Sequence, residues 1–367
     1  MRILLALGTS TGGVGRHVHD LADGLLAAGH DVVVAAPESV ARAFGYADLG
    51  ATVVPLEVTD RPHVTKDLAT VRALRAAAAG VDIVHAHGLR VGALAVLAGR
   101  GPHRAPLVVT LHNAAPAGAV SGTIHAGLER LVARGADLVL GVSTDLVDAQ
   151  QRLGARRAAL AVVPAATMPV VAKDRYAVRS EFAIEPRVPL LVTVARLAPQ
   201  KDLDLLLDAV AILTSRHDLE VASLVAGDGP LRAHLETRAR TEGLPVHVLG
   251  HRRDVPDLLA AADIVVSTAR WEGQPVALQE ALHLGTAIVA TDAGGTADVV
   301  QDAAILVPVG DAESLASALA DVLRHGSVRD DLRSKAMHRS GTLPTREEAI
   351  EAALTAYDSV LLDHDGR

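Results

Sequence analysis

Two glutamates bracket the predicted start of a helix in the stretch RWEGQPVALQE, which begins at Arg270. Glu272 lies on the loop before this helix, and Glu280 lies in about its second turn. The apolar run Asp263–Ser267 predicts a buried parallel strand ahead of the loop, and Pro275 suits the first helical position. Open α/β sheets bind ligands at the carboxyl ends of strands, where helix N-termini attract anions and carboxylates accept hydrogen bonds from hydroxyl groups. The stretch therefore predicts a sugar-nucleotide site, the alternative being two solvated glutamates.

Two cations follow another predicted strand, Leu190–Ala195. Arg196 and Lys201 stand between this strand and the next amphipathic segment, and lysine is rare, with four lysines among the 35 Lys and Arg residues. A guanidinium and an ammonium at the end of a strand can neutralise a diphosphate, and the guanidinium can contact two oxygens at once. The alternative is that both are exposed surface cations.

Three turns could also approach a ligand. The glycine-rich segment Gly8–His17 links the first predicted strand to the first helix, where backbone amides can approach a phosphate or sugar. It is not a Walker A loop, because Val14 replaces the required lysine, and it does not fit the G-x-G-x-x-G fingerprint. Gly227 lies in a second turn, and Arg252 lies in a third that could border the nucleotide base, while Asp254 is better explained as a helix N-cap. Each turn could equally have no ligand.

Some residue pairs match metal-binding patterns. His85 and His87 end a predicted strand, and side-chain alternation is expected to point their rings to opposite faces, which disfavours a shared metal. The segments 202–204 (DLD) and 363–365 (DHD) match an Asp-x-Asp pattern, but one opens a helix and the other lies in the tail, so both are interpreted as coincidences. His112 follows a predicted strand at the edge where ligands collect, unless it is a structural histidine. No metal site is expected.

Composition bounds the class of protein. A chain of 367 residues exceeds what one hydrophobic core usually supports, so two domains of about 150–200 residues are expected. Aromatic residues make up 2% of the chain and the net charge is −8, which argues against a nucleic-acid partner. The absence of cysteine excludes disulfides and thiolate sites and fits a cytoplasmic protein. The first apolar run is too short for a signal peptide, and no stretch of about 20 apolar residues predicts a membrane span.

Short apolar runs alternate with amphipathic segments, which is typical of βαβ units and parallel sheets. The Pro-containing segment 163–169 separates two such sets, so the predicted α/β domains are 1–170 and 171–345, with a C-terminal helix over 346–367 that could pack back on the first domain. The runs that predict strands are Ile3–Leu7, Asp31–Ala36, Thr52–Leu56, Asp82–His85, Leu107–Leu111, Asp137–Val142, Leu160–Val163, Leu190–Ala195, Val221–Ala226, Val246–Leu249, Ile264–Ser267, Ala287–Ala290 and Ile305–Val307.

Taken together, these stretches resemble the retaining glycosyltransferases of family 4 (glycosyl transferases group 1), which have the GT-B fold. The resemblance runs through nearly the whole chain: GGVGRHV, HAHG, VTLHN, ARLAPQKDLDLLLDA, LVAGDGPL and ADIVVSTARWEGQPVALQEALHLGTAIVATDAGG. The last stretch is the most specific, because it contains the Glu-x7-Glu region of the family. The resemblance implies two Rossmann-like domains whose parallel sheets face each other across a cleft, with 1–170 on the acceptor side and 171–345 binding the sugar-nucleotide donor.

The resemblance also implies a role for each candidate residue. Arg196 and Lys201 would hold the donor diphosphate. Glu280 would bind the nucleotide ribose, and Glu272 would contact hydroxyls of the transferred sugar. His112 would lie next to the reacting sugar. The implied catalytic set is Glu272, His112, Arg196 and Lys201, and the implied donor-binding set is Gly13, Gly227, Arg252, Gly273, Gln274, Pro275, Val276 and Glu280.

Three positions depart from the family pattern. The segment 164–166 reads Pro-Ala-Ala where Pro-Asn-Gly is common, Asp202 stands where glycine is usual, and Trp271 stands where Phe or Tyr is commoner. These departures concern the donor sugar and the interdomain details, not the reaction class.

The implied reaction is hexosyl transfer from a UDP-, GDP- or other nucleoside-diphosphate sugar to an acceptor hydroxyl, by same-face attack and without a metal or other cofactor. The alternatives are a 2-epimerase-like isomerase on the same fold and a non-catalytic sugar-nucleotide binding module. The acceptor could be a small molecule, a lipid-linked molecule or a saccharide. Basic clusters in the first domain could touch the inner face of a membrane, although solvated helix ends also explain them; they comprise Arg100, His103, Arg104, Arg152, Arg156 and Arg157.

Overall fold

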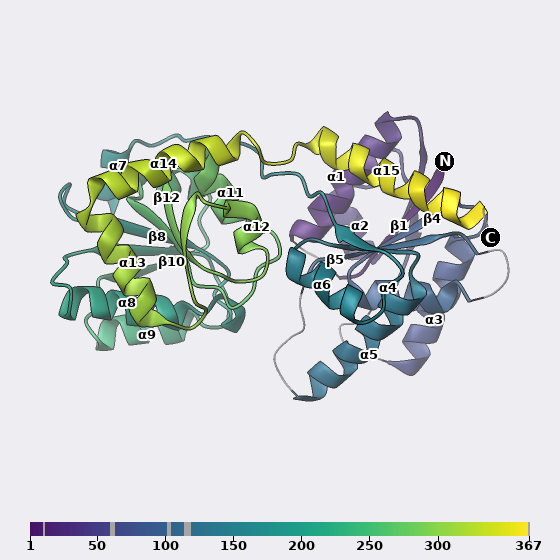
Figure 1. Ribbon diagram of the computed structural model, residues 1–367, viewed down its shortest axis with the longest axis horizontal. Coiled ribbons are helices and arrows are strands. Elements are labelled where there is room, and N and C mark those ends of the chain that lie inside the picture. Colours follow the sequence, from purple (N-terminus) through teal and green to yellow (C-terminus); the bar gives the residue numbers. More distant parts are fainter. Residues whose placement is uncertain (10–11, 59–62, 101–103, 114–118, 366–367) are drawn as a thin grey trace. The chain divides into compact units, whose positions relative to one another are not determined.

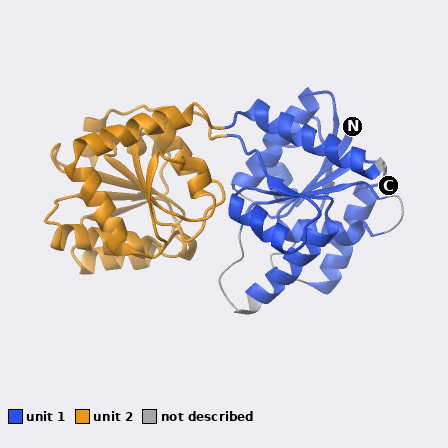
Figure 2. Cartoon of the chain, in the orientation of Figure 1, with its two compact units in different colours: residues 1–164, 344–367 blue, residues 165–343 orange. Residues whose placement is uncertain are grey.

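The computed structural model describes residues 1–9, 12–58, 63–100, 104–113 and 119–365. The chain forms two compact units (Figure 2), unit 1 from residues 1–164 and 344–367 and unit 2 from residues 165–343. The chain thus leaves unit 1 after residue 164 and returns to it for the last helix.

The sheet of unit 1 has seven parallel strands in the order β3-β2-β1-β4-β5-β6-β7. Its central strands are buried almost throughout and mostly apolar, because helices cover both faces of the sheet. The edge strand β7 begins two residues before the predicted run, because its residues are partly exposed and hydrophobicity does not mark it. The strands are β1 (Arg2–Leu7), β2 (Asp31–Ala36), β3 (Thr52–Pro55), β4 (Ile83–His87), β5 (Leu107–Leu111), β6 (Leu138–Gly141) and β7 (Ala158–Leu160).

Helices α3, α4 and α5 pack side by side on one face of this sheet, while α1 packs with α2 and α15 on the other (Figure 1). The helices of unit 1 are α1 (Gly13–Ala27), α2 (Glu38–Phe44), α3 (Val64–Ala77), α4 (Leu89–Ala98), α5 (Ala119–Gly135), α6 (Thr144–Arg152) and α15 (Arg346–Asp365).

The sheet of unit 2 has six parallel strands in the order β10-β9-β8-β11-β12-β13. One apolar core packs α8, α9 and α13 against one face, and a second packs α7, α10, α11, α12 and α14 against the other. The strands are β8 (Leu190–Val194), β9 (Ala222–Ala226), β10 (Val246–Gly250), β11 (Ile264–Ser267), β12 (Ala287–Thr291) and β13 (Ala304–Val307). The helices are α7 (Arg175–Glu181), the 3-10 turn η1 (Pro199–Lys201), α8 (Leu203–Ser215), α9 (Arg232–Thr241), α10 (Val255–Ala261), α11 (Val276–His283), α12 (Thr296–Val300), α13 (Ala312–Arg324) and α14 (Gly326–Ser340).

The strand order reverses once in each unit, between β1 and β4 in unit 1 and between β8 and β11 in unit 2. At such a reversal the connections after the two central strands diverge to opposite sides, which opens a crevice at the carboxyl edge of the sheet. In unit 2 these connections carry the predicted cations and the first predicted glutamate.

Aspartates hold the opposite, amino edge of both sheets. Asp263, just ahead of β11, accepts hydrogen bonds from the Leu190 N–H at 2.8 Å and from the Arg179 guanidinium at 2.8 Å. Asp137, just ahead of β6, accepts from the Leu107 N–H at 2.9 Å and from both terminal nitrogens of Arg104. The predicted strands begin at these two aspartates, but the observed strands begin one residue later. Each aspartate side chain instead binds the first residue of the neighbouring strand.

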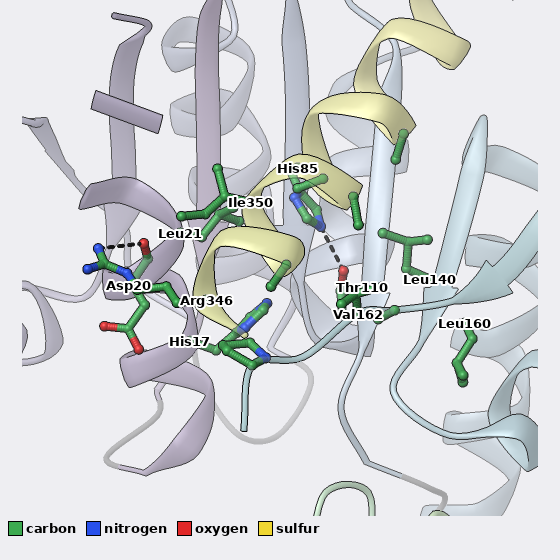
Figure 3. Close-up of a pocket in the computed structure, with 16 residues that line it drawn as sticks. His17, Asp20, Leu21, His85, Thr110, Leu140, Leu160, Val162, Arg346 and Ile350 are labelled. Carbon is green, nitrogen blue, oxygen red and sulfur yellow. Dashed lines mark hydrogen bonds between the residues drawn. The ribbon is translucent and has the colours of Figure 1, made fainter. Parts of the chain in front are cut away.

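The last helix is anchored in unit 1 by a buried tyrosine. The Tyr357 hydroxyl is 2.7 Å from Nδ1 of His85, and Nε2 of His85 is 2.7 Å from Oγ1 of Thr110. Helix α15 also crosses α1 closely, because a Cβ at Gly24 would lie 2.0 Å from Cδ1 of Ile350. A cavity of about 50 Å³ remains between α1, the sheet and α15 (Figure 3). It has room for a few water molecules.

Substituting Tyr357 by Phe should lower the stability of unit 1 by about 1–3 kcal/mol, because it leaves a buried ring nitrogen of His85 without its partner. Thermal unfolding followed by circular dichroism measures the change. Tyr176, which is 70% exposed, is the matched control, and its change to Phe should shift stability by less than about 0.5 kcal/mol. Equal stability of the two variants would contradict the anchor.

Candidate functional site

The two loops at the strand reversal of unit 2 are tied together by hydrogen bonds. The Thr268 hydroxyl donates to the carbonyl of Lys201 at 2.8 Å. The Gln200 side chain donates to the carbonyl of Trp271 at 2.8 Å, and the Arg270 N–H donates to the carbonyl of Gln200 at 2.8 Å. Because all three bonds are accepted by backbone carbonyls, they fix the path of both loops.

This tie brings together two residues that the sequence predicts separately. The Lys201 ammonium forms an ion pair with the Glu272 carboxylate, although the two residues are 71 positions apart. Their side chains are only 18% and 14% exposed. A predicted phosphate-binding cation and a predicted sugar-binding acid therefore meet at one point of the site.

Asp202 explains one departure from the family pattern. Its backbone is left-handed, with φ 45° and ψ 48°, a conformation that favours glycine and that Asp tolerates better than most residues. The Asp202 carboxylate also pairs with the Arg270 guanidinium, 3.0 Å away, across the two tied loops. The aspartate thus takes over the position of a glycine and adds a contact between the loops.

A pair of glycines supports the Glu272 loop from behind. The Gly295 N–H donates to the carbonyl of Glu272 at 2.7 Å. Gly294 has φ 56°, and a Cβ there would lie 2.3 Å from the Glu272 carbonyl oxygen and 2.5 Å from Nε1 of Trp271. Neither glycine was predicted to have a role, although two consecutive glycines after an apolar run are a signal of close backbone packing.

Gly227 packs beneath the Arg196 loop. A Cβ at Gly227 would lie 1.8 Å from the carbonyl oxygen of Ala195, so only glycine fits. Its N–H donates to the carbonyl of Gly250 at 2.8 Å and is already used within the protein. The structure therefore gives Gly227 a packing role, while a contact with the donor stays a prediction.

Helix α11 carries the second predicted glutamate. It begins at Val276, so Pro275 takes the N-cap position, one residue before the predicted one. Glu280 lies in the second turn, where its half-buried carboxylate makes no hydrogen bond or ion pair with the described residues. Burial raises the pKa of Glu280 because the charged form loses hydration. Arg196 is exposed and likewise makes no side-chain bond with the described part of the chain.

Four residues of the implied donor-binding set lie on the turn into α11. Gly273, Gln274, Pro275 and Val276 follow Glu272 directly, and Oε1 of Gln274 accepts a hydrogen bond from the Gln279 amide at 2.9 Å. Their contact with a sugar stays a prediction.

The start of unit 2 is held to the same helix through backbone atoms. The buried Gln279 accepts from the Ala166 N–H at 2.8 Å, and Nε2 of His283 is 3.1 Å from the Ala166 carbonyl oxygen. The side chain of Ala166 takes no part in these bonds. The departure from Pro-Asn-Gly at this point therefore leaves the attachment intact.

Arg252 is engaged within unit 2. Its guanidinium bonds to both oxygens of Asp254, at 2.8 and 2.7 Å, and to Glu181 at 2.7 Å, and it lies 5.6 Å from the ring centre of Phe182. The bonds from Asp254 and Glu181 raise the pKa of Arg252. The prediction that Asp254 caps α10 is wrong in its chemistry: Asp254 occupies the N-cap position, but its side chain binds Arg252 and Lys173. A donor contact by Arg252 stays a prediction.

Four histidines gather at the carboxyl edge of unit 1. Nδ1 of His87 is 3.3 Å from Nε2 of His112, and the ring centres of His85 and His87 are 4.1 Å apart. The expectation that His85 and His87 point to opposite faces is wrong, because residues two apart on a strand share a face. The ring of His17 lies 5.5 Å from those of His87 and His112.

These histidines are neutral near pH 7. Burial lowers the pKa of His17 to about 4, and burial together with the neighbouring His17 lowers the pKa of His85 to about 3. Burial and the neighbouring histidines also hold the pKa values of His87 and His112 well below the ordinary value. Each ring therefore offers one N–H donor and one acceptor nitrogen. Within the described ranges, no set of three or more His, Asp or Glu side chains is arranged to hold a metal ion.

Gly13 is the first residue of α1, and its predicted turn is described except for residues 10 and 11. A Cβ at Gly12 or Gly13 would meet nothing within 4 Å, so neighbouring atoms do not require glycine at either position. Among the described residues no side chain caps α1, and a contact between Gly13 and the donor stays a prediction.

Three of the four aspartates in the Asp-x-Asp segments bind other side chains. Asp202 pairs with Arg270, and Asp204 accepts from His234 at 2.9 Å and from Arg238 at 2.8 Å. In the second segment, Asp363 pairs with Arg157. These partners support the interpretation of both segments as coincidences.

Four of the six residues in the predicted basic clusters of unit 1 are also bonded internally. Arg104 and Arg156 both bind Asp137, and Arg157 binds Asp363 and Ser359. His103 lies outside the described residues. Within the described ranges, no helix has the length and apolar character that a membrane span needs. Contact with a membrane surface stays a prediction.

Comparison with known proteins identifies the family. The profile of the glycosyl transferases group 1 matches residues 174–339, and that of the glycosyl transferase 4-like domain matches residues 12–166. The chain therefore belongs to the glycosyl transferases group 1, and the predicted GT-B fold of two Rossmann-like units is confirmed.

Three similar proteins illustrate the relationship. Alpha-D-kanosaminyltransferase of Streptomyces kanamyceticus is 26% identical over 186 residues, 49% of this chain and 46% of that protein. D-inositol 3-phosphate glycosyltransferase of Jonesia denitrificans is 28% identical over 282 residues, 70% of this chain and 66% of that protein. The matched part thus spans between about half and about two thirds of these relatives. Anabaena Alr3699/HepE, crystallised with UDP, has a TM-score of 0.80 at 20% identity, covering 98% of this chain and 100% of that one.

Changing Gly294 to Ala should destabilise unit 2 and weaken binding of a nucleoside diphosphate, because the new Cβ displaces the Glu272 loop. The matched control is Gly310→Ala, since Gly310 also has a positive φ but open space around its Cβ position. Thermal unfolding should show a loss about 1–3 kcal/mol larger for the Gly294 variant. Equal losses would mean that the loop is not held by this contact.

Changing Glu280 to Gln should stabilise the free protein at pH 7 and weaken nucleotide binding. Because the folded-state pKa is raised, the ionised carboxylate costs stability above that pKa, and this cost disappears as the pH falls through it towards 4.5. The gain in unfolding free energy should therefore vanish over this pH range, which urea titrations at several pH values measure.

The affinity of the Glu280→Gln variant for the nucleotide should fall about tenfold or more with the loss of a charged hydrogen bond. The exposed Glu313→Gln is the control, and an unchanged affinity for Glu280→Gln would contradict the assignment.

Proposed function

We propose that the protein is a metal-independent, retaining glycosyltransferase that moves a hexosyl group from a nucleoside-diphosphate sugar to an acceptor hydroxyl. The observation that carries this proposal is the meeting of Lys201 and Glu272 at the strand reversal of unit 2, beside the start of α11. Membership of the glycosyl transferases group 1 supports the same reaction.

The charges of this site match the parts of a sugar nucleotide. Arg196 and Lys201 lie on the loop after β8 and would hold the diphosphate. Glu280 would accept hydrogen bonds from the ribose hydroxyls, which suits a half-buried carboxylate that has no partner among the described residues. Glu272 would contact the transferred sugar. Alr3699/HepE was crystallised with UDP and with UDP-glucose, which supports a donor of this class.

The transfer follows from where charge develops. The bond between the anomeric carbon and the diphosphate oxygen breaks, and negative charge grows on the leaving diphosphate, where Arg196 and Lys201 stabilise it. The acceptor oxygen forms its bond on the same face of the sugar, and its proton passes to the departing diphosphate. The two cations supply the charge that a metal supplies in other enzymes, which supports metal independence.

The acceptor would bind to unit 1, beside His112 and the start of α1. A neutral His112 offers one N–H to a sugar or acceptor hydroxyl. Similar proteins are named for a phosphatidylinositol dimannoside acceptor and for an undecaprenol-linked acceptor. We propose a cytoplasmic reaction with a small, lipid-linked or saccharide acceptor, in the lipid-linked case beside the inner membrane face.

The test is nucleotide release from UDP-, GDP-, ADP- and dTDP-sugars, with and without each acceptor class, in EDTA and in Mg²⁺. Acceptor-dependent release that EDTA leaves unchanged is expected. Conversion of the donor without any acceptor would indicate an isomerase, and binding without turnover would indicate a binding module. Loss of release in EDTA, restored by Mg²⁺, would contradict metal independence. The anomeric configuration of the product, read by NMR, tests retention.

Changing Lys201 to Ala should lower the rate of acceptor-dependent release by a factor of about 10² or more, because a charge that stabilises the leaving diphosphate is lost. The matched control is Lys335→Ala, which removes an ammonium paired with Asp331 on α14. Wild-type turnover by the Lys201 variant would contradict the diphosphate assignment.

A further inference from the structure

The ion pair between Lys201 and Glu272 has a consequence for ligand binding. Without a ligand, the ammonium that would hold the diphosphate is neutralised by a carboxylate of the protein itself. Arg196, in contrast, has no partner among the described residues, so it is available to an incoming anion at once. Arg196 can therefore bind an anion directly, whereas Lys201 must first separate from Glu272.

The backbones on both sides of the pair are fixed. The carbonyl of Lys201 is held by Thr268, and the carbonyl of Glu272 is held by Gly295 at 2.7 Å. Separation of the charges therefore requires rotation of the side chains, not movement of the loops. Each charge then needs a new partner, because both side chains are more than four-fifths buried.

We propose that Glu272 competes with the diphosphate for Lys201 and thereby makes the site select an intact sugar nucleotide over the free nucleoside diphosphate. This inference rests on the proposed function. An intact donor supplies phosphate oxygens to Lys201 and sugar hydroxyls to Glu272, so both charges are compensated. A free nucleoside diphosphate supplies only the phosphate oxygens and leaves the Glu272 carboxylate unpaired in a poorly hydrated place.

The same exchange acts after transfer. Once the sugar has left, Glu272 loses its hydroxyl partners and can return to Lys201. The returning carboxylate displaces the diphosphate from the ammonium and promotes release of the product. Glu272 thus acts as a specificity-determining residue through its charge, in addition to its contact with the sugar.

The test is calorimetric titration of UDP, GDP, ADP and dTDP into the full-length protein and its Glu272→Gln variant. Glutamine keeps the shape of glutamate but cannot neutralise Lys201. The variant should therefore bind its preferred nucleoside diphosphate about three- to tenfold more tightly than the wild-type protein does. The affinity for the matching nucleotide sugar should not rise in proportion, so the preference for the intact donor should fall. The control Asp331→Asn, which breaks an exposed lysine pair on α14, should leave affinity unchanged.

A double variant separates competition from simple charge repulsion. In a Lys201→Ala background, Glu272→Gln should have no effect on the affinity for the nucleoside diphosphate. The carboxylate and the diphosphate then have no ammonium for which to compete. An equal gain in that background, or an unchanged or weaker affinity of the single variant, would overturn the inference while leaving the proposed function intact. Absence of binding by all four nucleoside diphosphates, together with absence of turnover, would instead remove the proposed function and this inference with it.

Discussion

The hydrogen bonds between the loops after β8 and β11 are the constraint on which the site of unit 2 depends. The strand order places these loops side by side, and bonds to the carbonyls of Lys201, Gln200 and Trp271 hold them there. They bring a cation and an acid into contact across 71 positions of sequence. The Arg270–Asp202 pair strengthens the same junction. A site built in this way is formed before a ligand arrives, which limits the conformational entropy that binding must overcome.

Much of the fold followed from the alternation of apolar runs and amphipathic segments. Parallel strands buried on both faces appear as continuous apolar runs, so most observed strands lie within a residue or two of the predicted ones. The bounds of the edge strand β7 were predicted poorly, because its exposed residues do not form a continuous apolar run of this kind. The candidate cations and acids were found because they follow strand ends. Their pairing could not be predicted, since it depends on strand order, which one-dimensional patterns do not contain.

Glycine and charge are ambiguous in sequence for a physical reason. A glycine can bring backbone close to a ligand, as predicted for Gly227, or close to another loop, as Gly227 is to Ala195. Likewise an arginine near a strand end can bind a phosphate or hold two helices together, as Arg252 does through Glu181 and Asp254. Only the partner distinguishes these cases, and the partner is remote in sequence. The histidine pair on β4 is a different case, because residues two apart on a strand share a face whatever their partners are.

The return of the chain to unit 1 affects the order in which the protein forms. The strands of unit 1 are synthesised first, but the helix that covers His85 is synthesised only after all 179 residues of unit 2, from 165 to 343. Unit 2 is contiguous and can fold as soon as it leaves the ribosome. Unit 1 must wait with an apolar face exposed until Ile350 and Tyr357 emerge. The unit that begins the chain is therefore the last to complete its core.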